Sequence, residues 1–316
     1  MEALLALSFS NMTSTSPAKI RRGLRHTEGL LAQLCLDSAT PDSAASSSSS
    51  SPSKRRTSAA PSDANGGASG TARRVVPGGR REDGDGDGDA VKTLDVLGRD
   101  LAFREFFRLQ ESFEWNVPTR SITCLERLLG MGSSPQNDAL ILSTLHLLQG
   151  TLLLHPPSRT LFRLPSSMTL LLDLLDASSP PAIQSQALLV LVTAMLGVPG
   201  NTRCFEAVGG LATVTSMLKR KGRGGEGERK VKMGAVEFLY FYLMAETPAP
   251  ASMPEDDRGN PTPATAILHR ASDGAAEEQE QGGGLTRSTE QKTKMLSRYL
   301  SNVEDLVGDL REGAAF

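Results

Sequence analysis

Cysteine and histidine are the residue types in this chain best suited to nucleophilic or metal chemistry, and their spacing supports neither. A phosphate-binding Cys-x5-Arg loop needs Arg six residues after its cysteine, but here that position holds Pro or Gly (Pro41 after Cys35, Gly130 after Cys124 and Gly210 after Cys204). The four histidines form no HExxH or other paired ligand spacing (His26, His146, His155 and His269). The sequence therefore predicts neither a cysteine nucleophile nor a metal site. The cysteines lie in apolar helical patterns and are typical of reduced thiols in a cytosolic protein.

Two glycine-rich segments match part of a ligand-binding motif but lack the neighbouring elements and residues that such a motif needs. The run GRGGEG at residues 222–227 satisfies GxGxxG, but it follows a helical pattern instead of a strand and has no ribose-binding acid after it. The run DGDGDGD resembles an EF-hand loop that starts at Asp83, yet its twelfth position is Leu94 instead of the bidentate Glu. We therefore expect no bound nucleotide, metal or other cofactor, no small-molecule substrate and no enzymatic activity.

Charge and hydropathy exclude two further classes of partner. The formal net charge is −2, whereas nucleic-acid binding needs a concentrated basic face. The longest apolar run is interrupted by His146, Gln149, His155 and Pro156, so no segment is long enough to span a bilayer. The apolar N-terminus MEALLALSF lacks the basic region of a secretory signal. We expect a cytoplasmic protein that binds no nucleic acid and does not insert directly into membranes.

The elements that carry these residues repeat along the chain. The segment HPPSRTLFRLPSSMTLLLDLLD matches VPGNTRCFEAVGGLATVTSMLK forty-three residues later, with Pro156 on Pro199 and Phe162 on Phe205. Armadillo and HEAT units have periods of about 40 to 47 residues. Chance self-alignment of a leucine-rich helical chain is the alternative, and the matched Pro and Phe positions argue against it. The sequence predicts an all-α fold, an armadillo/HEAT-like right-handed helical-repeat solenoid with long disordered insertions.

Composition divides the chain into five parts. Two stretches have almost no apolar residues to offset their ordering entropy. The expected parts are N-terminal helices that dock on the core (1–36), a disordered Ser/Gly/Asp-rich insertion (37–91), armadillo-like repeats (92–245), a disordered linker (246–287) and a C-terminal amphipathic helix (288–312). In the first insertion, Ser51 precedes Pro52 and Ser58 follows a pair of arginines, so both are possible phosphorylation sites.

Arg, Asn and aromatic side chains recur near the proline-marked breaks between the expected helices. Arg, Trp and Tyr are the side chains most often found as anchors in protein interfaces. We predict a partner-binding row that consists of Trp115, Asn116, Arg120, Arg159, Asn201, Arg203, Tyr240 and Tyr242. The alternative is that such residues cap helices, pin the turns or, for the tyrosines, belong to the core.

Long blocks of the chain resemble the fungal cell division control protein 14 family. They include KIRRGLRHTEGLLAQLCL, FFRLQESFEWNVPTRSITCLERLLG, NDALILSTLHLLQGTLLLHPPSRTLF and LSNVEDLVGDLREGA. That family is a component of the septation initiation network and is unrelated to the phosphatase of similar name. The resemblance implies a noncatalytic, armadillo-like regulatory or scaffold subunit. It would bind a germinal-centre type protein kinase, localise to the cytoplasm and the spindle pole body, and promote septum formation and cytokinesis.

Two other functions remain open. A generic armadillo-like adaptor for a polarity or trafficking complex would co-purify with a different partner. A peripheral membrane protein would use MEALLALSF and the C-terminal helix, although the polar face of that helix carries Glu304 and Asp305, which anionic lipid repels.

Overall fold

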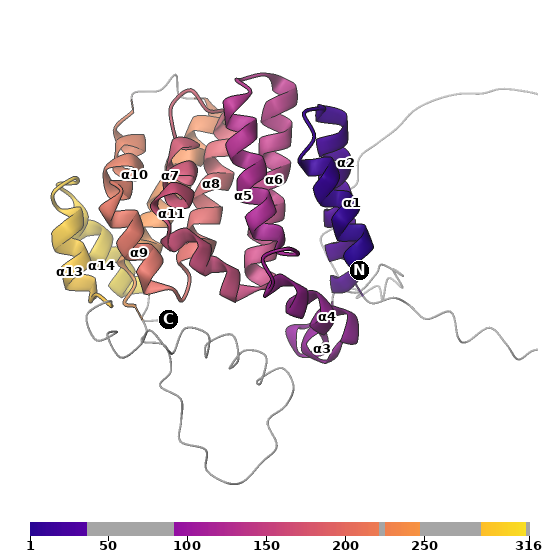
Figure 1. Ribbon diagram of the computed structural model, residues 1–316. Coiled ribbons are helices and arrows are strands. Elements are labelled where there is room, and N and C mark those ends of the chain that lie inside the picture. The colour runs from indigo at the N-terminus through magenta and orange to yellow at the C-terminus, as the bar shows by residue number, and fades with distance from the viewer. Residues whose placement is uncertain (37–91, 221–224, 247–285, 314–316) are drawn as a thin grey trace, which may run out of the picture. The chain divides into compact units, whose positions relative to one another are not determined.

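The computed structural model describes residues 1–36, 92–220, 225–246 and 286–313, and every regular element in these residues is a helix (Figure 1). This confirms the all-α class. Residues Met1–Cys35 and Lys92–Phe316 belong to one compact unit. The expected insertion at 37–91 with Ser51 and Ser58, the Asp/Gly run, and most of the expected linker lie outside the described residues.

The helices follow one another with short connections. In chain order they are α1 (Glu2–Met12), α2 (Pro17–Cys35), α3 (Leu94–Arg99), α4 (Leu101–Gln110), α5 (Val117–Gly130), α6 (Pro135–Leu154), the 3-10 helix η1 (Pro156–Arg163), α7 (Pro165–Asp173), α8 (Pro181–Met195), α9 (Pro199–Ala207), α10 (Gly210–Lys219), α11 (Glu226–Leu243), α13 (Thr289–Leu296) and α14 (Val303–Gly313). Proline in the first turn begins most of the central elements, because its fixed φ suits that turn and its missing N–H would have no helical partner there.

A three-helix pattern occurs twice in the centre of the chain. A long helix, a short proline-initiated helix and a third helix follow one another as α6, η1 and α7, and again as α8, α9 and α10. The long helices pack in sequence, α6 on α8 and α8 on α11 (Figure 1). The short helix η1 packs on α9. The self-similar segments of the sequence therefore have the same order of elements.

A glycine pair makes the corner between α9 and α10. Gly209 has φ 83°, in the left-handed region that glycine adopts without strain. A Cβ on Gly210 would lie 2.2 Å from the ring of Phe205. Both glycines are therefore required for the sharp turn, the first by its backbone conformation and the second by close packing.

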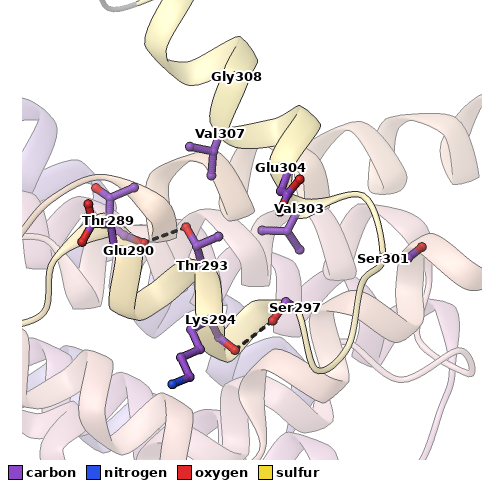
Figure 2. Close-up of a pocket in the computed structure, with 10 residues that line it drawn as sticks. All are labelled: Thr289, Glu290, Thr293, Lys294, Ser297, Ser301, Val303, Glu304, Val307 and Gly308. Atoms are coloured by element: carbon purple, nitrogen blue, oxygen red, sulfur yellow. Dashed lines mark hydrogen bonds between the residues drawn. The ribbon is translucent and has the colours of Figure 1, made fainter.

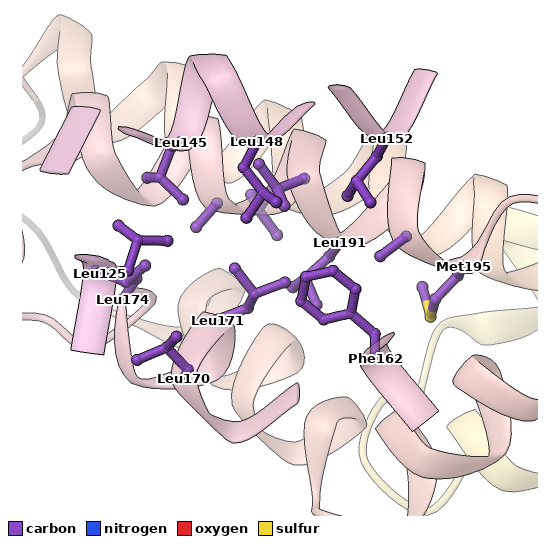
Figure 3. Packing of buried hydrophobic residues seen from close by; sticks show 14 of the residues in the cluster. Leu125, Leu145, Leu148, Leu152, Phe162, Leu170, Leu171, Leu174, Leu191 and Met195 are labelled. Carbon is purple, nitrogen blue, oxygen red and sulfur yellow. The ribbon is translucent and has the colours of Figure 1, made fainter. Parts of the chain in front are cut away.

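The core joins side chains from both copies of the pattern. Leu148 of α6, Phe162 of η1 and Leu191 of α8 are fully buried and point into the same interior (Figure 3). Phe162 and Phe205, which align in sequence, are both 0% exposed. Each such side chain contributes about 1.5–3 kcal/mol on burial, so these apolar positions hold successive helices together.

The N-terminal helices form a close antiparallel pair. A Cβ on Gly23 of α2 would lie 2.6 Å from the carbonyl oxygen of Ser8 in α1, so only glycine permits this approach. Arg127 of α5 donates to the carbonyl oxygens of Met12 and Ser14 at 2.8 and 2.5 Å. The pair packs on α5 and α6 through Leu5, Leu24 and other buried side chains.

The single C-terminal helix expected over 288–312 is instead two helices, α13 and α14. The capping box of Ser288 and Gln291 starts α13 as its sequence indicates. The chain then turns, and both helices pack on α11 and on each other. The reason is burial. Leu296 of α13 and Val303 of α14 are 0% and 2% exposed, and one straight helix could not pack both of its apolar halves against α11.

In the part of the chain that the structure describes, no single helix is long and apolar enough to cross a membrane. The helices α6 and η1 together have that length and composition, but they are bent by 118°.

Candidate partner-binding site

The predicted partner-binding residues lie at the corners between helices, and many of their polar groups are used inside the fold. Asn116, Asn201 and Tyr242 are 8%, 0% and 1% exposed, whereas Trp115, Arg120, Arg159, Arg203 and Tyr240 are partly exposed. Three clusters account for most of them: a neutral corner, an arginine-and-asparagine corner next to it, and a charged corner.

The neutral corner consists of Asn116, His155 and Ser158. Asn116 caps α5 by accepting from the backbone of Thr119, and its Nδ2 donates to Gln110 O at 2.6 Å and to Ser158 Oγ at 2.8 Å. Ser158 Oγ in turn lies 2.8 Å from His155 Nδ1. Since Ser158 accepts from Asn116, its own hydrogen is available to His155. Burial lowers the pKa of His155 from 6.5 to about 4, so the imidazole is neutral at pH 7.

Asn201 and Arg159 form the next corner. Asn201 Nδ2 donates to Arg159 O at 2.7 Å and to Ala194 O at 2.6 Å. The guanidinium of Arg159 donates to Leu152 O at 3.0 Å and to Leu196 O at 2.8 Å, and burial lowers its pKa. Three of these four bonds satisfy carbonyl groups at the ends of α6 and α8, which would otherwise lack donors, and the fourth satisfies a carbonyl group of η1.

The charged corner consists of Arg203, Glu206, Glu246, Arg287 and Lys292. Arg203 of α9 pairs with Glu206 at 3.3 Å and with Glu246 at 2.5 Å. Arg287 pairs with Glu206, and its backbone N–H donates to Glu246 Oε2 at 2.9 Å. Three cations thus share two carboxylates, of which Glu206 has a side chain only 4% exposed. The corner joins α9, the chain after α11, and α13.

Lys292 is the most buried cation of the charged corner. Its side chain is 3% exposed, and Nζ lies 3.0 Å from Glu246 Oε1, 2.8 Å from Met244 O and 5.3 Å from the centre of the Tyr242 ring. Burial lowers its pKa, and the neighbouring Glu246 opposes that shift. Tyr242 donates to Glu206 Oε1 at 2.7 Å, and burial followed by this bond raises the pKa of its phenol. A cavity of about 280 Å³ lies beside Tyr242 and Lys292.

An aromatic–arginine cluster lies outside these corners, at the end of α4 and the start of α5. The Arg120 guanidinium lies 5.6 Å from the ring centres of both Phe9 and Phe113, and it donates to Glu114 O at 3.3 Å. Phe113 is 77% exposed, and Trp115 packs half-buried beside the core. Exposed aromatic rings with an arginine are the composition of interface anchors.

The placement of the predicted row is therefore mixed. Hydrogen bonds inside the chain favour the alternative role of helix caps and turn pins for Asn116 and Asn201. Burial favours the alternative role of a core residue for Tyr242. Partner binding by Trp115, Arg120, Arg159, Arg203 and Tyr240 remains a prediction.

Sequence reasoning did not single out Ser158, Glu206, Glu246, Arg287 or Lys292. The repeat spacing of the sequence indicates the partners of two of them, Ser158 and Glu246. Asn116 bonds Ser158 at a separation of 42 residues, and Arg203 bonds Glu246 at a separation of 43. Polar residues one repeat apart therefore meet, and a search at that spacing would have found both. Arg287 and Lys292 follow residues 247–285 and have no such signal.

The described residues contain no group of three or more His, Cys, Asp or Glu side chains placed to hold a metal ion. The cysteines in them are free, with Cys124 buried and Cys35 and Cys204 half-buried. A groove of about 590 Å³ lies between α13 and α14 (Figure 2). Two of the hydroxyl groups that line it bond to carbonyl oxygens of the preceding turn, Thr293 to Thr289 O at 2.7 Å and Ser297 to Lys294 O at 3.0 Å. The groove presents neither His nor Cys.

Comparison with known proteins gives the family. The family model for "Cell division control protein 14, SIN component" matches residues 1–316, where SIN is the septation initiation network. A relative from Schizosaccharomyces pombe (strain 972), named cell division control protein 14, is 29% identical over 213 residues, which cover 65% of this chain and 75% of the relative. The comparison with solved structures found no match. The chain belongs to the cell division control protein 14 family, the septation initiation network component.

Proposed function

We propose that this chain is a noncatalytic scaffold subunit of the septation initiation network that binds a germinal-centre type protein kinase and promotes septum formation and cytokinesis. The observation that carries the proposal is the family match over the whole chain, to a network component in the control of cell division. The cytoplasm and the spindle pole body are the proposed locations.

The use of polar groups supports a noncatalytic role. In the neutral and charged corners, side chains that could act as acids or bases are bonded to one another or to helix ends. His155, for example, is buried and bonded to Ser158, and it lines neither of the two cavities described above. Such groups hold helices in place. The acid–base pair that lines the smaller cavity, Glu246 with Lys292, belongs to the ion-pair network that holds α13.

The recurring helix order supports an armadillo-like, right-handed stack. A long helix, a short proline-initiated helix and a third helix recur at the period of armadillo repeats. One such unit cannot cover its own apolar face, so neighbouring units bury it. A protein built this way offers an extended surface for a protein partner.

We place the kinase contact at the aromatic–arginine cluster of Phe113, Trp115 and Arg120. Phe113 is 77% exposed and is held against Arg120, so a partner could bury a preordered ring and guanidinium at little cost in side-chain entropy. In contrast, Arg159 and Arg203 already use their guanidinium groups inside the chain.

Co-purification of the kinase with tagged full-length protein tests the proposal. The variant Phe113→Ala with Arg120→Ala is expected to weaken kinase binding at least tenfold, because interface anchors contribute about 2 kcal/mol or more each. A matched control is Met233→Ala with Lys230→Ala, which also removes one exposed apolar and one exposed basic side chain, from α11. The melting temperature of each variant must equal that of the wild type.

Three outcomes decide between the functions. Loss of the kinase in the first variant alone supports both the function and the surface. Unchanged binding refutes the surface, in which case Arg159→Ala with Arg203→Ala is compared next, at matched stability. Recovery of a polarity or trafficking complex without the kinase refutes the scaffold role and favours the generic adaptor.

A further inference from the structure

The outward side of α1 is mostly apolar although protein does not cover it. Its exposed residues are Ala3, Leu4, Ala6 and Leu7, together with Glu2 and Ser10. Leu5 and Phe9 face the core and are 0% and 7% exposed, whereas Leu4 and Leu7, on the other side, are 36% and 54% exposed. Leucines left together at the surface of a docked helix are typical of a binding surface. The exposed side of α1 therefore marks a contact with something outside this chain.

The outward side of α2 carries four cations: Lys19, Arg21, Arg22 and Arg25. In the described part of the chain no ion pair involves Lys19, Arg21 or Arg22. The acid in α2 is Glu28, which is half-buried and interacts with Arg25 and with His146 of α6. The positive charge of this face is therefore not neutralised within the helix.

The apolar and basic sides form one continuous surface. The two helices touch where Gly23 meets Ser8. On α1, Leu5 lies to the buried side of Ser8 and Leu4 to the exposed side; on α2, Thr27 lies to the buried side of Gly23 and Lys19 to the exposed side. A step of four residues rotates by about 40° around a helix, so Leu4 and Lys19 flank the Ser8–Gly23 contact on its exposed side. The exposed edge of α1 therefore adjoins the exposed edge of α2.

We propose that this α1–α2 face binds peripherally to a bilayer surface rich in anionic lipid. The four cations contact the acidic headgroups, while Leu4 and Leu7 enter the boundary between headgroups and acyl chains. The cations are spread over about 160° of the circumference of α2. Long Lys and Arg side chains can extend from the flanks of a helix to a plane of headgroups. The same bilayer takes up Leu4 and Leu7, which a purely acidic peptide would leave exposed.

Nucleic acid fits less well, and the C-terminal helices do not add a second contact. A nucleic acid would use the cations but would leave the leucines exposed. The C-terminal helices, which the sequence offered as a second membrane contact, turn their apolar side chains inward, because Leu296 and Val303 are buried. The N-terminal pair therefore carries the contact by itself.

Flotation of the purified full chain with vesicles tests the inference. We expect binding to vesicles of phosphatidylcholine with phosphatidylserine, weaker binding at high salt, and little binding to phosphatidylcholine alone. Each Lys or Arg near an anionic surface strengthens binding about fivefold. The variant Arg21→Gln with Arg22→Gln should therefore bind about 25-fold more weakly, and Leu4→Gln with Leu7→Gln at least tenfold more weakly.

The control is Lys294→Gln with Arg298→Gln, which removes the same charge from exposed positions of α13 and of the turn after it. All variants must keep the wild-type melting temperature. The inference is overturned if wild type does not float with anionic vesicles, or if the control loses as much binding as the α2 variant. Binding to soluble polyglutamate with no binding to vesicles would also overturn it and would assign the face to an acidic protein.

Discussion

The neutral corner and the charged corner involve equivalent short helices, η1 and α9, in successive copies of the helical pattern, yet their chemistry differs. Asn116, His155 and Ser158 are joined by hydrogen bonds without a formal charge. In the next copy, Arg203 and Glu206 stand where Thr160 and Arg163 stand in η1, and they belong to a network of three cations and two carboxylates.

The difference follows from what each corner must hold. The neutral corner joins helices that follow one another with short connections, so a few hydrogen bonds suffice to set their angle. The charged corner holds α13, which follows α11 only after residues 247–285. Closing such a long segment costs entropy, and a helix that arrives from so far can dock in several registers. We interpret the buried ion pairs as a device that selects one register, a role attested for buried polar groups in other folds.

Removing one carboxylate from the charged corner should have the largest effect. In Glu206→Gln, Arg203 and Arg287 lose a buried counterion, and such a loss costs about 3–5 kcal/mol. Urea denaturation of the purified chain measures the free energy of unfolding. The control Glu105→Gln breaks an exposed i,i+3 pair with Arg108 and should leave stability unchanged. Equal effects of the two substitutions would contradict the importance of burial.

Acid should weaken the neutral corner through His155. The folded-state pKa is about 4 and the unfolded value is 6.5, so below pH 6.5 the unfolded chain takes up a proton that the folded chain does not. His155 therefore favours folding fully above pH 6.5, and about 3 kcal/mol of that contribution is lost as the pH falls to about 4. Unfolding free energies of wild type and His155→Gln across this range measure the difference. Parallel curves would show that His155 is not the titrating group.

Disrupting the corner of Asn201 and Arg159 should have an intermediate effect on stability. Asn201→Ala removes the donor to the buried carbonyl oxygen of Ala194 and to the partly buried one of Arg159, which costs about 2 kcal/mol. Thermal and urea unfolding are compared with Gln33→Ala, an exposed amide on α2, where no change is expected. A loss below the experimental error at Asn201 would mean that water replaces the amide.

The smallest effect is expected for Lys292→Met. Glu246 keeps Arg203 and the Arg287 backbone N–H, and methionine fills a similar volume without the desolvation of a charge, so the cost is under about 1.5 kcal/mol. Lys292→Glu, in contrast, adds a third carboxylate and should release α13, which hydrogen exchange over residues 289–296 would detect. Protection that stays unchanged in Lys292→Glu would show that apolar contacts alone hold α13.

Several features of the fold could be predicted because they depend on local chemistry. The helices at Pro17, Pro181 and Pro199 start where proline favours a first turn, and the capping box at Ser288 forms as its spacing indicates. The sharp corner at Gly209 and the buried Phe162 and Phe205 also follow from residue type and from their recurrence. The break between α13 and α14 could not be predicted, because one continuous apolar stripe suits one helix or two and only the surface of α11 decides between them.

In the candidate site, too, some features follow from the sequence and others depend on tertiary contacts. Sequence alone determined that the chain is helical, that its pattern recurs every 43 residues, and that Arg, Asn and aromatic side chains gather at the recurring corners. Only the tertiary structure decided which of those side chains are turned inward as caps and pins, as Asn201 is, and which stay at the surface beside Phe113. The physical reason is that the helix period specifies the face on which a residue lies, whereas burial of that face and the partner of each charge depend on segments far away in the chain, such as α13 for Arg203 and Glu206.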